Sequence, residues 1–425
     1  MLRAWGPGQP RPGRRPADVG LLLVVAVAYV LPLFRVDPSL AWASGDEICC
    51  HLPAIRAIQR EGLWHAVTDY RYYRSATTPL YHMVMSLAID RVDPLAIRAA
   101  WIVATFAVAF LLYRHIRSDP ALRRGAQAGV ALALAFLLSP TTRASAVYFV
   151  TDGLALDLAI AALVLLRRAR TAAAFSPSIG ALAVVTAFAS FYTRQYYVWV
   201  PLYVAWRVLA EGATWRSRAA TIGGCALLGL PGAALLAAWH GATPPLGMPV
   251  HTHPALPSTL PNALGLLALY SIPLTWIALR DRESQAKIGS HMRAPVLLSL
   301  GLAAFVTLGL ALGFAVPQAG GILRVVNVLG GAGLIVFLAV SYLGLVMLVR
   351  WYVVDGPRQL WWAAFLLPLL TGSVLLQRYF EPAVMVFLFL VARPRDALEV
   401  LDSRLVWFYP GFTAAYALFR IVYFA

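Results

Sequence analysis

The first residues suited to chemistry lie in the segment GDEICCHLPAIRAI, positions 45–58. This segment follows a long apolar run. This segment places Asp46, Glu47 and His51 close together. Glu47 and His51 are four positions apart, so on a helix they share one face and can bond each other. A carboxylate here can act as a general base. It can also merely favour the start of a helix through the helix dipole.

Further charged residues occur where the chain is otherwise strongly apolar. Asp152 lies in VYFVTDGLALDLAI, Arg194 lies in FYTRQYYVWVP and Arg378 lies in LLQRYFEPA. Charges in such segments are costly unless they are solvated or paired, so each marks either a functional site or a buried contact between helices. An arginine can also extend its head group to the lipid surface. Two arginines flanked by tyrosines indicate an anionic ligand, because a guanidinium matches phosphate oxygens with forked hydrogen bonds.

These residues must be held by membrane helices. Of the 425 residues, 60% are hydrophobic and 13% are charged, so a soluble globular domain is excluded. Only helices and closed barrels satisfy their own backbone hydrogen bonds in a hydrocarbon layer about 30 Å thick. We therefore predict an all-α polytopic membrane protein, one domain over 1–425 with about 11–13 transmembrane helices. The candidate stretches are 20–36, 97–116, 126–140, 146–166, 178–192, 195–210, 219–238, 260–279, 294–316, 324–349, 360–376, 379–392 and 405–424.

The basic residues predict the topology rather than a nucleic-acid site. The formal net charge is +16, but the basic residues do not form the continuous patch that groove binding requires. With the N-terminus in the cytoplasm, most arginines fall on the cytoplasmic side, as the positive-inside rule requires. The exceptions on the external side are candidates for function, and they include Arg56, Arg71, Arg74, Arg194 and Arg378.

The first external loop, 37–95, is expected to carry interfacial helices. Its segment DEICCHLPAIRAIQREGLW has apolar residues at helical spacing, which predicts a helix lying in the membrane interface. The later segment TTPLYHMVMSLAID is too short to span, so we expect it to dip into the membrane or lie along its surface. The apolar face of the first helix is expected to comprise Ile48, Leu52, Ile55 and Ile58.

Neither a metal centre nor a disulfide framework is predicted. The second external loop, 239–258, contains His251 and His253, but no carboxylate or thiol lies near them, which favours a lid over a metal site. Cys49 and Cys50 are adjacent in the sequence, and we do not expect them to pair with each other.

Five short blocks, in this order along the chain, resemble one family of membrane enzymes. They are similar to the motifs of the α-1,2-glucosyltransferases that use dolichyl-phosphate glucose, within the GT-C superfamily. The histidine of the first block stands one position later than is usual in that family, and Gln377 stands where an acid is common. The blocks are Asp46-Glu47-Ile48 with His51-Leu52-Pro53, Thr77-Thr78-Pro79-Leu80-Tyr81, Thr151-Asp152, Arg194-Gln195 followed by Trp199, and Arg378-Tyr379-Phe380 with Pro382.

The resemblance implies a GT-C-like fold and a hexosyltransferase. The enzyme would move a hexose, with glucose as the best guess, from a polyprenyl-phosphate sugar to a glycan or lipid-linked acceptor, with inversion at the anomeric carbon. It would need no cofactor and no metal, and it would work at the external face of the plasma membrane among its lipids. The arginine-rich, lysine-poor composition further suggests a bacterium. By this likeness the catalytic residues are Asp46, the leading candidate base, with Glu47 and His51. The residues that bind the donor phosphate and substrate are Arg194, Gln195, Arg378, Tyr379, Thr77, Thr78, Tyr81 and Asp152.

Two other classes of protein stay open at this point. A lipid or glycolipid transporter, such as a flippase, would use the same charges as a path without catalysis. Many transporters of this kind show paired halves or inverted repeats with broken helices, and the sequence shows no internal repeat. A scaffolding protein without activity would not require the acids and the arginines together.

Overall fold

The computed structural model is helical throughout the part of the chain that it describes, and no strand occurs among these residues. This confirms the prediction of an all-α protein. The described residues are 25–31, 41–69, 75, 77–171, 176–211, 215–241, 256–280, 294–314, 326, 329–370 and 380–424.

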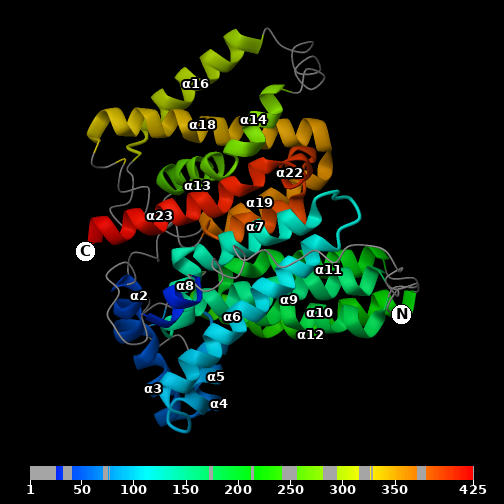
Figure 1. Cartoon of the computed structure of the whole chain (residues 1–425). Helices are drawn as coiled ribbons and strands as arrows, with labels where there is room; N and C mark the ends of the chain where they lie inside the picture. The colour runs from blue at the N-terminus through cyan, green and yellow to red at the C-terminus, as the bar shows by residue number, and fades with distance from the viewer. Residues whose placement is uncertain are drawn as a thin grey trace, which may run out of the picture.

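Short helices fill the first predicted external loop. They lie together at one end of the molecule, drawn in blue and cyan in Figure 1. Each is too short to cross a bilayer, as expected for interfacial elements. They are α2 (Ala41–Asp46), the π-helix η3 (Glu47–His51), α3 (Leu52–Glu61), α4 (Leu63–Asp69) and α5 (Leu80–Ala88).

A bundle of longer helices comes next in the chain, and α6 and α9 to α12 run side by side in it (Figure 1). Each apolar stretch predicted between 97 and 238 falls on one or two of these helices. They are α6 (Pro94–Arg117), α7 (Gly125–Leu138), α8 (Pro140–Val147), α9 (Thr151–Thr171), α10 (Pro177–Thr193), η5 (Gln195–Val198), α11 (Trp199–Glu211) and α12 (Trp215–Trp239).

The second half of the chain adds a further group of helices against α7 and the first bundle (Figure 1). They are α13 (Leu256–Tyr270), α14 (Ile272–Arg280), α16 (Ala294–Ala311), α18 (Gly330–Asp355), η7 (Pro357–Leu360), α19 (Trp361–Leu370), α21 (Ala383–Val386), the π-helix η8 (Phe387–Ala392), α22 (Arg395–Leu401), η9 (Arg404–Trp407) and α23 (Phe408–Phe424).

Fewer helices are long enough to span a membrane than the sequence predicts. In the described part of the chain, α6, α18 and the 218–239 part of α12 are long and apolar enough to cross by themselves. Two bent pairs, α7 with α8 and α13 with α14, would bring the count to five. Other predicted stretches form shorter helices, such as α10 with 17 residues and α11 with 13. The structure therefore supports a helical membrane protein, and the count of 11–13 spans stays a prediction.

Prolines account for the two bent pairs. α7 and α8 meet at 59°, and α13 and α14 meet at 66°. Ser139 precedes Pro140 and is extended, with φ −58° and ψ 126°, because a residue before proline is disfavoured in the helical region. Pro273 comes directly after the second break, where its missing N–H cannot continue the helical hydrogen bonds. The first bend aims the polar helix α8 toward the interfacial helices (Figure 1).

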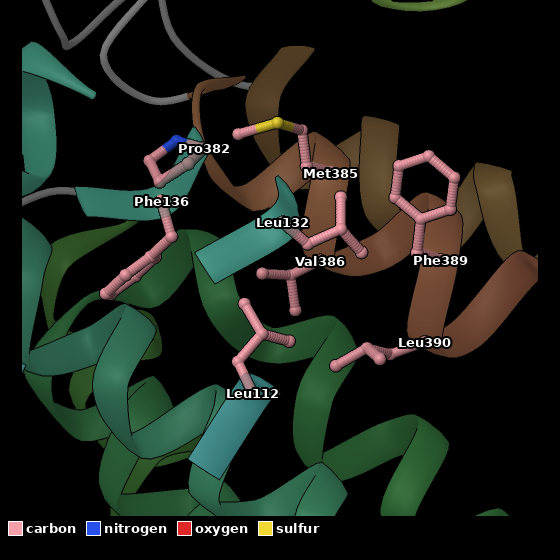
Figure 2. A pocket seen from close by; sticks show the side chains of 8 residues that line it. All are labelled: Leu112, Leu132, Phe136, Pro382, Met385, Val386, Phe389 and Leu390. Atoms are coloured by element: carbon pink, nitrogen blue, oxygen red, sulfur yellow. The ribbon is translucent and has the colours of Figure 1, made fainter. Parts of the chain in front are cut away.

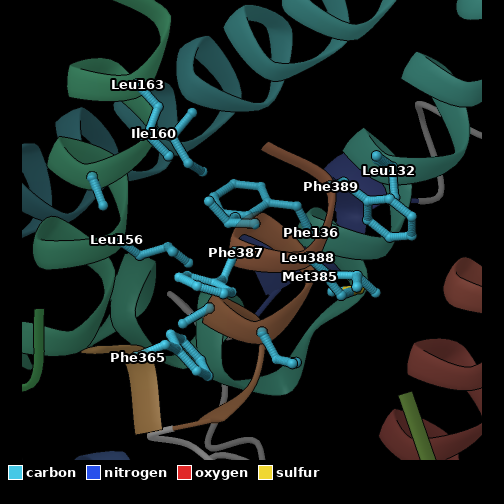
Figure 3. Close-up of a cluster of buried hydrophobic side chains, with 14 of the residues drawn as sticks. Leu132, Phe136, Leu156, Ile160, Leu163, Phe365, Met385, Phe387, Leu388 and Phe389 are labelled. Atoms are coloured by element: carbon cyan, nitrogen blue, oxygen red, sulfur yellow. The ribbon is translucent and has the colours of Figure 1, made fainter. Parts of the chain in front are cut away.

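Aromatic packing fixes the interior between the two halves of the chain. The Phe387 ring of η8 lies 4.6 Å from that of Phe365 and 5.2 Å from that of Trp199, measured between centroids. Figure 3 shows Phe387 beside Phe365, with Leu156 of α9 next to them. Large fully buried rings of this kind contribute strongly to core stability, so η8 is held firmly against α9, α11 and α19.

Ion pairs join the loops at the end of the bundle opposite the interfacial helices. The Asp119 carboxylate lies 3.6 Å from the guanidinium of Arg167 and 2.7 Å from that of Arg393. The Asp402 carboxylate accepts a hydrogen bond of 2.9 Å from the backbone N–H of Arg124. α6 has 24 residues, so this end lies about 35 Å from the start of α6. Three of the arginines that the charge rule predicts to be cytoplasmic, Arg124, Arg167 and Arg393, therefore lie at this end.

Candidate functional site

The interfacial helices dock on the ends of α8, α9 and α10. The Thr78 hydroxyl donates a 2.9 Å hydrogen bond to the carbonyl of Phe191 in α10. Ala43 of α2 packs in a buried cluster with Ala144 and Val150. Tyr81 of α5 is buried in a second cluster that includes residues of α3 and α6. These contacts bring the first-loop residues next to the polar residues of the bundle.

Glu47–His51 forms a π-helix, which contains one more residue in its turn than an α-helix does. The extra residue rotates the side chains of this turn, Ile48 among them, relative to those of α3 after it. Ile48 is consequently 66% exposed, whereas Ile55 and Ile58 are buried. The prediction that Ile48 shares their apolar face was therefore wrong.

Cys49 and Cys50 form a disulfide within this turn. The expectation that these adjacent cysteines do not pair was wrong, because the two sulfur atoms meet across the single peptide bond that joins the residues. Cys225, in α12, is a free thiol.

Glu47 is held by a buried ion pair. Its carboxylate lies 2.6 Å from the guanidinium of Arg98 in α6, and its second oxygen accepts a 2.9 Å hydrogen bond from the N–H of Phe149. Arg98 also donates to the Val147 carbonyl at 2.8 Å. Among the described residues, Glu47 bonds these partners, and the possible bond between Glu47 and His51 is not formed. Glu47 anchors the π-helix to α6 and to the turn before α9.

His51 instead bonds a second histidine. Its Nδ1 lies 2.9 Å from Nε2 of His82 in α5, and the two rings are nearly parallel at 20°. Burial, together with the nearby positive charge of Arg194, lowers the pKa of His82 to about 3. The ring of Tyr81 stands edge-on to both histidines. Burial also raises the pKa of the Tyr81 phenol, and its hydroxyl has no hydrogen-bond partner in the described part of the chain.

Arg194 is fixed by α9. It caps the C-terminus of α10 in an extended conformation, with φ −154° and ψ 118°. Its guanidinium lies 2.9 Å from the Asp152 carboxylate and donates a 2.7 Å hydrogen bond to the Thr151 hydroxyl. The ring of Tyr196 lies 5.6 Å from the guanidinium carbon. All of these groups are buried, so Asp152 and Thr151 determine the direction in which Arg194 points.

The structure brings most of the predicted site residues together. Thr77, Thr78, Tyr81 and Gln195 are buried beside the groups described above. The hydroxyl of Thr77 bonds that of Ser75 at 2.8 Å. Asp46 ends α2, directly before the π-helix, and is partly exposed. Two predicted residues, Arg378 and Tyr379, lie outside the described residues, as does the 242–255 part of the second external loop.

Three residues of the site were not predicted. Arg98 was counted within an apolar span, although an arginine near the external start of a span also departs from the positive-inside rule. His82 was passed over next to Tyr81, although it is an imidazole in a nearly apolar helix. Thr151 was noted only as the neighbour of Asp152. Each of the three is a polar residue within an apolar segment, and this feature of the sequence could have identified them.

Acidic, basic and imidazole groups thus meet at one end of the bundle. Such a set can accept a proton, bind hydroxyls and hold an anion. Among the residues that the structure describes, no group of three or more His, Cys, Asp or Glu side chains could hold a metal ion.

A separate crevice lies between α6, α7 and the α21–η8 segment, as Figure 2 shows. Its lining is wholly apolar, and it is too small to admit a sugar, a phosphate or a lipid chain. None of the predicted site residues contributes to it. The lining residues are Leu112, Leu132, Phe136, Pro382, Met385, Val386, Phe389 and Leu390.

Comparisons with protein-family models, with curated proteins and with solved structures find no match to this chain. A function for this protein therefore has to be inferred from the residues of the site and from their arrangement.

Proposed function

We propose that this protein is a glycosyltransferase of the GT-C type. It moves a hexose, with glucose as the best guess, from a polyprenyl-phosphate sugar to a glycan or lipid-linked acceptor. The observation that carries the proposal is the docking of the first loop on the end of α10, where the Thr78 hydroxyl bonds the Phe191 carbonyl three positions before Arg194. This contact brings the acidic first-loop turn to the same end of the bundle as the Arg194–Asp152 pair.

The reaction needs a proton acceptor and a cation. Asp46 accepts the proton of the acceptor hydroxyl while that oxygen bonds to the anomeric carbon. The bond from this carbon to the phosphate oxygen breaks, and its electron pair leaves with the polyprenyl phosphate. Attack on the face opposite the phosphate inverts the anomeric carbon. Arg194, and Arg378 by the family likeness, stabilise the charge that grows on the phosphate.

The roles of the two first-loop acids differ. Glu47 is saturated by Arg98 and the Phe149 N–H, so it positions the turn and does not take the proton. Asp46 is the more exposed of the two, and it is therefore the better base. The site lies at the external face of the membrane in this proposal, because the positive-inside rule assigns most arginines of the chain to the opposite face.

Turnover with defined substrates tests the proposal. The purified protein in lipid nanodiscs is incubated with short-chain polyprenyl-phosphate glucose or mannose and a panel of lipid-linked and free glycan acceptors. We expect transfer by the wild type, and transfer at least about 100-fold slower for Asp46→Asn with donor binding retained. Asp90→Asn is the matched control, since Asp90 is an exposed aspartate of the same loop.

Two results would contradict the proposal. Equal turnover by wild type and Asp46→Asn would remove Asp46 as the base. Movement of a labelled polyprenyl-phosphate sugar across vesicles, without any glycan product from the full acceptor panel, would favour the transporter alternative.

A further inference from the structure

The first-loop helices α3 and α5 pack against the C-terminal end of α12. Ala54 and Ile58 of α3 form a buried cluster with Trp239, the last residue of α12. Met83 of α5 packs against the same cluster. The 218–239 part of α12 has 22 residues and extends about 33 Å, close to the thickness of a hydrocarbon layer. Trp239 therefore marks the level at which this candidate span leaves the hydrocarbon layer.

Most of α12 is not covered by protein. Only 6% of its apolar 18-residue stretch is buried inside the protein. Its exposed apolar side chains include Ile222, Leu227 and Leu230. A helix that spans a membrane presents such side chains to the acyl chains of lipids. The medium around α12 is therefore lipid, and α3 and α5 lie next to that lipid at the membrane interface.

The helix α4 follows α3 after one residue outside the helices, and it begins with two exposed apolar side chains. Trp64 is 78% exposed and Leu63 is 37% exposed. Another side of this segment is polar, because the His65 imidazole lies 3.2 Å from the Glu61 carboxylate and 3.9 Å from the Asp69 carboxylate. Successive residues of an α-helix are about 100° apart, so Leu63 and Trp64 point away from this polar row.

This arrangement suits the boundary between lipid and water. A helix with one apolar and one polar side lies in the plane of the interface. Tryptophan is enriched at that level, because its ring is apolar and its indole N–H is polar. α4 lies beside α3 at the lower edge of the molecule (Figure 1), and α3 is fixed at the level of Trp239. Lipid is thus within reach of the exposed side of α4.

We propose that α4 lies in the lipid head-group layer, with Leu63 and Trp64 inserted at the upper ends of the acyl chains. The partner of this surface is the bilayer itself. The inserted face differs from the one expected from the sequence, since Ile55 and Ile58 are buried within the protein. The contact holds the outer end of the first loop on the membrane, and it does not depend on the transferase function.

Nitroxide spin labels test the position of α4 in the full-length protein in lipid nanodiscs. The label is attached to Trp64→Cys in a Cys225→Ser background, which lacks the free thiol. No reductant is used, so the disulfide of the first loop stays closed. We expect the label to collide more often with dissolved oxygen, which concentrates in the membrane, than with a nickel chelate, which stays in water.

Two further labelled positions serve as references. A label at Leu227→Cys, on the exposed surface of α12, should be reached by oxygen and hardly by the chelate. A label at Glu61→Cys, on the polar side, should be reached mainly by the chelate. Equal access of the chelate to the labels at positions 64 and 61 would show that α4 lies in water and would overturn the proposal. A label at position 64 that is shielded from both reagents would show that protein, such as a second copy of this chain, covers α4, and would overturn it too.

Quenching by brominated lipids tests the native side chain. The difference in fluorescence between the wild type and Trp64→Phe isolates the signal of Trp64, and we expect brominated acyl chains to remove most of it. The difference between the wild type and Trp351→Phe is the control, because Trp351 is fully buried and stacks on Trp362. A Trp64 signal that persists in brominated lipids as well as that of Trp351 does would contradict the insertion.

Discussion

The buried Glu47–Arg98 pair gives a direct test of how the first loop is anchored. The side chains are 7% and 22% exposed, and each has a further backbone partner. Arg98→Met leaves the Glu47 carboxylate buried with only the Phe149 N–H, so we expect it to lower the free energy of unfolding by about 3–5 kcal/mol. Glu47→Gln keeps an oxygen for the Phe149 N–H, and the partly solvated Arg98 keeps its bond to Val147. We expect that change to cost about 1–3 kcal/mol.

The double variant tells whether these costs arise from one interaction. With both charges absent, no unpaired ion is left in the interior. We therefore expect the double variant to be more stable than the sum of the single changes predicts, by about 1–3 kcal/mol. The free energy of unfolding is measured by titrating the protein in mixed micelles with dodecyl sulfate, followed by the fluorescence of its 13 tryptophans.

Arg56→Met provides the matched control, because Arg56 pairs with Asp90 on the exposed surface of the same loop. An exposed pair of this kind contributes little to stability, so that variant should behave as the wild type does. Additive effects of Glu47→Gln and Arg98→Met, within about 0.5 kcal/mol, would refute the reasoning. The π-helix would then be held by contacts other than this pair.

Three further predictions concern the same end of the molecule and use the same unfolding assay. Burial lowers the pKa of His82 from 6.5 to about 3, so between these values the unfolded chain binds a proton that the folded chain does not. The contribution of His82 to the free energy of unfolding is therefore greatest above pH 6.5 and is lost as the pH falls. Between pH 7.5 and 5.0, the free energy of unfolding of the wild type should fall by about 2 kcal/mol more than that of His82→Phe. Parallel pH profiles of the two proteins would contradict this. Asp152→Asn leaves the Arg194 charge buried and should cost about 3–5 kcal/mol; a loss under about 1 kcal/mol would mean that the Arg194 site is hydrated. Thr78→Val removes the bond to the Phe191 carbonyl and should cost about 1 kcal/mol, whereas an unchanged stability would show that the loop docks by other contacts.

The positions of the helices could be predicted from the sequence because apolar runs are local signals. The stretches predicted at 97–116 and 178–192 correspond to α6 and α10 with small shifts of their ends. The number of spans could not be read in the same way. The run 126–140 corresponds to α7, but α8, which follows from Pro140, leaves α7 at 59° and can be counted either as part of the same broken span or as a separate element.

The members of the site could largely be predicted, but their pairing could not. Asp152 and Arg194 stand out as charges in apolar segments, yet nothing in either segment says that they bond each other. Glu47 and His51 have a spacing typical of an α-helical contact, but the π-helix turns them to different partners. Arg98 and His82 come from separate helices, so their roles depend on how those helices dock. Such long-range contacts leave no periodic trace in the sequence.

α6 joins two ends of the molecule that are built in different ways. At one end the Asp119 carboxylate pairs with both Arg167 and Arg393, which come from well-separated parts of the chain, and so links these segments. At the other end the Glu47–Arg98 pair, the Phe149 N–H and the His51–His82 contact hold one short turn against the bundle. A rearrangement that admits a bulky substrate is thus expected at this end, where it needs to release only that turn. The end held by Asp119 would keep its geometry, so that such a rearrangement need not disturb the bundle as a whole.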